Sequence, residues 1–168
     1  MPLVKAGTIL ADPWRRLADD EAVPGDGPVA VGFKRWTAER AALRGRSAPL
    51  GIALANTDPA AELAPDLDRL GVVMLHFPKF IDGRAYSQAR LLRERFGYRG
   101  ELRATGEVLR DELFFMARCG FDAFETDERG AAGFAAAMRD FTLAYQPATN
   151  DAGLGLRRHV PRGVPRAG

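Results

Sequence analysis

The chain has 168 residues, a single cysteine, 46% hydrophobic residues and a formal net charge of +2. This length allows a hydrophobic core in one domain, and the lone cysteine excludes an internal disulfide and fits a reducing compartment. No stretch approaches the roughly 20 apolar residues that span a bilayer, and the N-terminus is too weakly hydrophobic for a secretory signal. We therefore expect a soluble cytoplasmic protein that does not bind membranes.

The positive charge is concentrated near the C-terminus. Residues 151–168 contain four arginines and one aspartate, and the rest of the chain is nearly balanced. The pI near 9.0 is therefore no indication of a nucleic-acid-binding face. The segment is rich in Gly, Pro and Arg and lacks apolar periodicity. We expect residues 1–150 to form one α/β domain and residues 151–168 to be a disordered basic tail, with contact to an acidic partner as the alternative role.

The first third of the chain carries weak signals. Thr8–Leu10 is compatible with an edge strand, and Asp12-Pro13-Trp14 opens a turn, because proline presets the backbone there. The apolar run at residues 29–33 predicts a strand. Thr37 is a capping residue and predicts a helix over residues 38–43.

The remainder alternates between short apolar runs and longer amphipathic segments. The short runs predict strands at residues 50–54, 72–77, 101–105 and 121–125. The longer segments predict helices within residues 60–70, 86–96, 108–119 and 130–145. In the third helix Leu109, Leu113, Met116 and Ala117 form the expected buried stripe.

Alternating strands and helices define an α/β protein with a mainly parallel sheet of about five strands joined by crossover helices. Two arrangements remain open, a flavodoxin-like open sheet and a partial (β/α) barrel. A complete eight-unit barrel is excluded because it needs about 250 residues.

Ligands of parallel α/β proteins bind at the carboxyl ends of the strands, and the richest such place follows the run at 72–77. Lys79 and Arg84 flank a turn that contains Asp82, and Ser87 lies in the first turn of the next helix. Cations and free backbone N–H groups favour a small oxyanion or a phosphate. The alternative is that Asp82 caps the helix and Arg84 is a solvated side chain.

Two later strand ends add candidates. Arg110 follows the run at 101–105, and Glu125 ends the run at 121–125. Arg103 lies inside a strand, so it must reach a ligand, solvent or a carboxylate, and Glu101 and Glu125 are the candidate partners. The predicted anion-binding set is thus Lys79, Arg84, Ser87, Arg103 and Arg110, and the candidate catalytic residues are Lys79, Asp82 and Glu125.

Several common chemistries lack a signal. Neither a P-loop nor a dinucleotide-binding glycine motif is present, so no cofactor can be assigned from the residues alone. Cys119 ends an apolar helix and is expected to be a buried structural thiol. His76 and His159 lie too far apart in sequence to suggest a metal site.

The stretch Phe77-Pro78-Lys79-Phe80, the segment from Asp82 to Arg93, and the continuation from Arg99 to Asp122 together resemble the bacterial DUF934 family. Members of this family are labelled oxidoreductases involved in sulfite reduction. The resemblance covers roughly residues 50–145 and is most specific over residues 77–125. It implies a role in sulfite and sulfate assimilation beside sulfite reductase or phosphoadenylylsulfate reductase, and it carries over no catalytic residue.

Two hypotheses follow. The first is an accessory protein that binds a small oxyanion, such as sulfite, or docks on a reductase through residues 79–93, with affinity falling in Arg84→Ala. The second is an oxidoreductase whose site gathers Lys79, Asp82, Arg84, Arg103 and Glu125 and which holds flavin or NADPH without a recognised motif; its activity would be lost in Glu125→Gln.

Overall fold

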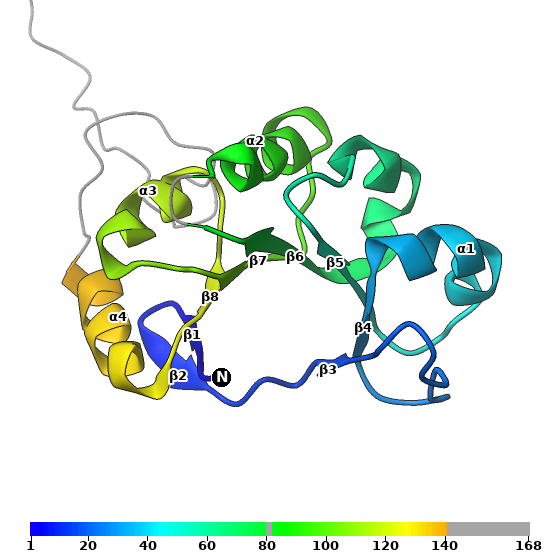
Figure 1. Cartoon of the computed structure of the whole chain (residues 1–168), viewed down its shortest axis with the longest axis horizontal. Helices are drawn as coiled ribbons and strands as arrows, with labels where there is room; N and C mark the ends of the chain where they lie inside the picture. Colours follow the sequence, from blue (N-terminus) through cyan, green and yellow to red (C-terminus); the bar gives the residue numbers. More distant parts are fainter. Residues whose placement is uncertain (80–81, 141–168) are drawn as a thin grey trace, which may run out of the picture.

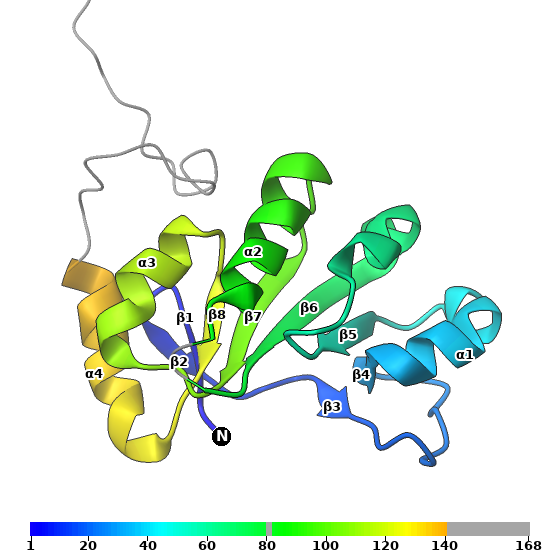
Figure 2. The ribbon, with the colours of Figure 1, turned by 45° about the horizontal axis from the view of Figure 1, so that its top comes forward.

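The computed structural model describes residues 1–79 and 82–140. These residues form an eight-stranded sheet that curls into a half-barrel, with the helices arranged along its outer face (Figure 1). Figure 2 shows the same helices side by side above the strands, with the N-terminal segment passing beneath. The architecture is α/β, as the sequence predicts.

The strand order follows the chain from β3 to β8. In order across the sheet, the strands are β2 (Thr8–Leu10), β1 (Leu3–Lys5), β8 (Ala123–Glu125), β7 (Glu101–Gly106), β6 (Leu70–Phe77), β5 (Leu50–Leu54), β4 (Val29–Gly32) and β3 (Arg15–Arg16). Neighbours from β3 to β8 are parallel, and β1 is antiparallel to both β8 and β2. A sequential order is typical of a (β/α) barrel, so the flavodoxin-like alternative is wrong and the partial barrel holds.

All five predicted parallel strands are present, together with the edge strand at Thr8–Leu10. The count of about five is nevertheless too low, because β1 and β3 were not predicted. β3 is only two residues long and consists of two arginines, so it has no apolar pattern. β1 is a three-residue strand that pairs with the neighbouring β2 and with β8, which lies at the far end of the described chain.

The helices connect the strands on the outer face. They are α1 (Phe33–Arg44), η1 (Ala60–Arg69), α2 (Arg84–Arg90), η2 (Leu91–Arg95), η3 (Arg110–Glu112), α3 (Leu113–Arg118) and α4 (Glu128–Asp140). η1 and η3 are 3₁₀-helical, and η2 is a π-helical turn that continues α2. The predicted continuation of the last helix to residue 145 and the predicted basic tail lie outside the described residues.

Two helix predictions need correction. α1 begins at Phe33, so Thr37 lies inside the helix, where its Oγ1 donates to the Phe33 carbonyl at 2.9 Å instead of capping the N-terminus. Leu109 does not join the buried stripe of Leu113 and Met116, since the helix begins only after it and its side chain is 42% exposed.

The main core lies between the sheet and the helices. Side chains alternate along β6, and Val73, Leu75 and Phe77 face the helices, where they join a cluster that includes Ala89 and Leu92 of α2 and η2. Each of these five residues is fully buried. Burial of this apolar face supplies the main driving force that holds the helices on the sheet.

The inner face of the half-barrel is filled by the N-terminal segment. Trp14 packs in a small cluster with Ala30, Val72 and Met74, whose side chains face inward. Trp14 also lies against Gly51 and Gly71, where a Cβ would be 3.3 Å and 2.8 Å from the indole ring. The absence of a side chain at these glycines thus makes room for the indole.

β2 and β3, the two edge strands, are joined by only residues 11–14. A chain of that length spans at most roughly 18 Å, so the connection crosses the open side of the half-barrel from one edge to the other. Figure 1 shows this segment passing below the curled sheet.

We predict that Gly51→Ala destabilises the protein by about 1–3 kcal/mol, because the added methyl group overpacks the inner face. It would overlap the Val72 side chain and lie 3.2 Å from the Val72 carbonyl oxygen. Urea unfolding followed by circular dichroism measures the change. Gly25→Ala is the control, because nothing lies within 4 Å of its added Cβ; equal midpoints for the two variants would contradict the packing described here.

Candidate functional site

A buried arginine organises the polar part of the inner face. Arg103, on β7, is 0% exposed. Its Nε and Nη2 donate to Glu101 Oε1 at 3.0 and 2.8 Å, and its Nη1 donates to Asp12 Oδ2 at 2.7 Å and to Glu125 Oε1 at 3.2 Å. The sequence predicted pairing with Glu101 and Glu125, and both contacts are present. Asp12 was missed because it lies 91 residues away in the chain.

Two further cations complete the network. Lys5 Nζ donates to Glu101 Oε2 at 2.7 Å, and Arg16 Nη2 donates to Glu125 Oε1. Three carboxylates therefore face three cations, and the set is formally neutral. Lys5, Asp12 and Arg16 all belong to the N-terminal segment, so the network fastens that segment to β7 and β8.

The pKa shifts agree with this geometry. Burial opposes the ionised form of Asp12, but hydrogen bonds from Arg103 and the Trp14 backbone N–H outweigh it and lower the pKa of the carboxyl. Burial also disfavours the charged form of Arg103, and the hydrogen bonds to Asp12 and Glu101 reverse this and raise its pKa. Both groups are ionised at neutral pH.

This arrangement limits what Arg103 can do chemically. Four of its five N–H groups already donate to carboxylates, so an oxyanion that binds two N–H groups of Arg103 would have to displace one of them. Separating a buried charge from its partner is costly, which favours a structural role for this residue. Its assignment to the anion-binding set, like the catalytic role suggested for Glu125, stays a prediction.

A second polar cluster lies beyond the carboxyl end of β6. Arg84 Nε and Nη2 donate to the two oxygens of Asp82 at 2.9 and 2.6 Å, and Asn56 Nδ2 donates to the same carboxylate. The Arg84 hydrogen bond is the main reason that the pKa of Asp82 falls from its ordinary 3.8 to about 2. Asp82 also accepts a hydrogen bond from the Arg84 backbone N–H at 3.2 Å. The N-cap residue of α2 is Gly83 and the helix has no side-chain cap, so the alternative in which Asp82 caps the helix is wrong.

We call the loops that follow the carboxyl ends of the strands the rim. The other predicted anion-binding residues are dispersed around it. Lys79 lies two residues after the end of β6 and is exposed, and Ser87 is exposed on α2. The Arg110 side chain lies near Gly133 of α4, whose Cβ would be 3.7 Å from Arg110 Nη1. No hydrogen bond or ion pair described for residues 1–79 and 82–140 joins Arg84 or Arg110 to Arg103, so the structure does not bring the predicted set into one cluster.

The structure also places His76 and Cys119, the two other residues considered for a chemical role. His76 lies at the end of β6 on the inner side of the rim, with its Nδ1 at 3.4 Å from Thr105 Oγ1. It is exposed. Cys119 is 0% exposed, as expected of a structural thiol, and burial raises its pKa.

Within the described ranges, no three His, Cys, Asp or Glu side chains are placed so that they could hold a metal ion. In the same part of the chain, no helix has the length and apolar character needed to cross a bilayer.

These features define an α/β protein with a partial (β/α) barrel whose inner face is covered by its own N-terminal segment. Residues 51–153 match the sequence profile of DUF934, described as a bacterial protein of unknown function. This match covers more than half of the 168 residues, and the chain belongs to the DUF934 family. A comparison with curated proteins finds no match.

We predict that Arg103→Met lowers the free energy of unfolding by about 3 kcal/mol, because it leaves three carboxylates on the inner face without their shared cation. This loss of stability is at the lower end of the range for breaking a buried ion pair, because Lys5 and Arg16 still contact two of the three carboxylates. Urea titration measures it, with Arg84→Met as the matched control. Arg84 is exposed, so its substitution should hardly move the midpoint. Equal effects would contradict a structural role for Arg103.

Proposed function

We propose that the chain is an accessory protein of sulfite reduction that binds a small oxyanion and contacts sulfite reductase or phosphoadenylylsulfate reductase through its outer surface. The family resemblance of residues 77–125 supports the pathway. The resemblance carries over no reaction, and the proposal therefore assigns the chain a binding role.

One structural observation supports binding at the surface. In complete (β/α) barrels, catalytic residues project into the mouth at the carboxyl ends of the strands. Here Asp12, Trp14 and Arg16 lie on the inner face and contact β5 to β8 or their flanking residues. The interior, which side chains of the remaining strands fill in a complete barrel, is thus covered here by the chain's own N-terminal segment.

Hydrogen bonds between the side chains of the rim also support binding at the surface. The Asp82 carboxylate is shared by Arg84 and Asn56, and the side-chain amide of Gln88 donates to the carbonyls of Ala55 and Asp58 at 2.9 Å. These bonds tie the loops after β5 and β6 together. Loops fixed in this way need little rearrangement on binding, which supports docking of another protein at the rim.

The proposal is tested with purified sulfite reductase. Immobilised chain should bind the reductase, and added chain should change the rate of sulfite-dependent NADPH oxidation by the reductase. The chain alone should leave NADPH and sulfite unchanged. Arg84→Ala, which releases Asp82 and loosens the rim, should weaken binding several-fold if the rim forms the contact.

The oxidoreductase alternative gives the opposite results. Turnover of NADPH with sulfite by the chain alone, or a flavin spectrum retained through purification, would contradict an accessory role. Loss of that turnover in Glu125→Gln, with folding intact, would identify the inner face as the active site. Absence of binding to both reductases would remove the proposed partners.

A further inference from the structure

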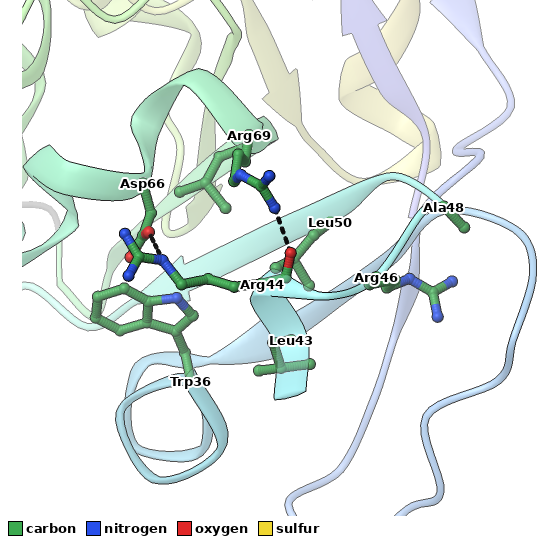
Figure 3. Close-up of a pocket in the computed structure, with 9 residues that line it drawn as sticks. Trp36, Leu43, Arg44, Arg46, Ala48, Leu50, Asp66 and Arg69 are labelled. Atoms are coloured by element: carbon green, nitrogen blue, oxygen red, sulfur yellow. Dashed lines mark hydrogen bonds and ion pairs between the residues drawn. The ribbon is translucent and has the colours of Figure 1, made fainter. Parts of the chain in front are cut away.

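An arginine-lined pocket lies at the opposite end of the barrel from the rim. It is formed where α1 and η1 end and β5 and β6 begin (Figure 3). It is lined by Trp36, Leu43, Arg44, Arg46, Ala48, Leu50, Asp66, Arg69 and Leu70. Its location follows from the topology: helices run antiparallel to the parallel strands, so their C-terminal arginines gather near the strand N-termini.

The pocket carries more positive than negative charge. Arg40 Nε donates to Asp66 Oδ2 at 2.7 Å and Arg44 Nε donates to Asp66 Oδ1, so one carboxylate serves two arginines. Arg69 Nη1 donates to the Arg44 carbonyl. Arg46 donates to backbone carbonyls of the loop at residues 24–27. In the part of the chain that the structure describes, Asp66 is the one carboxylate that forms an ion pair with any of these four arginines, and it pairs with Arg40 and Arg44.

The directions of the side chains show which arginines face the pocket. Figure 3 shows Arg44 and Arg69 on two sides of it, while the Arg46 guanidinium points away. Arg46 donates to uncharged backbone carbonyls, which do not neutralise its positive charge, and its Nε is buried without an acceptor. Because both oxygens of Asp66 are occupied, its repulsion toward an incoming anion is reduced.

The walls restrict the size of a ligand. Trp36 and Leu43 are buried and form an apolar side, and Arg40 stacks on the Trp36 ring with its Cζ 4.4 Å from the ring centroid. The cavity has a volume of about 30 Å³, roughly two to three times the minimum for one water molecule. An inorganic oxyanion of four or five atoms fits this space, and a nucleotide base does not.

We infer that a free inorganic oxyanion binds in this pocket, held by the guanidinium groups of Arg44 and Arg69. Arginine is suited to the role because its planar fork presents two donors to an oxyanion. The inference rests on the proposed function only in the choice of sulfite as a ligand. It places the oxyanion at the start of β6, whereas the sequence placed it after the end of β6, around Lys79 and Arg84.

Calorimetric titration of the full chain with sulfite, sulfate and phosphate tests the inference. A separate titration with AMP tests whether the site binds a phosphate ester instead. Arg69→Gln should weaken oxyanion binding about tenfold, because a charged donor is lost. Lys34→Gln is the control: it removes one exposed positive charge at the start of α1, away from the pocket, and should bind as the unchanged chain does. Both variants are first compared by circular dichroism and urea midpoint.

A second readout is local. In ¹⁵N-labelled protein, saturation with sulfate should shift the Trp36 indole resonance and leave that of Trp14 in place. Unchanged affinity in Arg69→Gln, or an equal loss in Lys34→Gln, would overturn the inference. Tighter binding of AMP than of all three inorganic ions would overturn the assignment to a free oxyanion. Failure of every oxyanion to bind, with reductase binding intact, would remove this site and leave the proposed protein contact standing.

Discussion

The burial of one charged side chain constrains this fold more than any other interaction. Arg103 has no exposed surface, so its charge must be matched by carboxylates, and the matching groups come from β7, β8 and the N-terminal segment. Its neighbours on β7, Leu102 and Ala104, face the helices and belong to the apolar core. β7 thus joins two layers of opposite character, a hydrophobic outer layer and an ionic inner one.

The network also connects the region that matches the DUF934 family with the N-terminal segment that precedes it. Glu101, Arg103 and Glu125 lie within the matched residues 51–153, whereas Lys5, Asp12 and Arg16 precede them. The matched region therefore depends on N-terminal residues for its charge balance. With the inner face covered, the surfaces open to partners are the helical layer, the rim after the strands and the arginine-lined end before them. The proposed binding role would use these surfaces.

The strands of the sheet were predictable because their apolar runs are continuous, as in Val72–Phe77, which is covered on both faces. The lengths of the connections predicted parallel pairing. Short-range patterns failed elsewhere: Thr37 has the chemistry of a cap, but α1 begins earlier, after Gly32. At the site, the alternation of β7 and β8 placed Arg103 beside Glu101 and Glu125. The contact with Asp12 and the insertion of Trp14 are long-range packing events that no local pattern encodes. The pocket at Arg44 and Arg69 depends on where helix ends meet in space, which the order of residues does not reveal.

The most direct measurement is a double-mutant cycle between Arg103 and Asp12. Stabilities of the unchanged chain, Arg103→Met, Asp12→Asn and the double variant are obtained from urea unfolding at neutral pH. If the buried ion network holds the N-terminal segment on the inner face, the two positions are coupled by about 1–3 kcal/mol, and Asp12→Asn has almost no effect once Arg103 is gone. Additive effects, with a coupling near zero, would contradict the account.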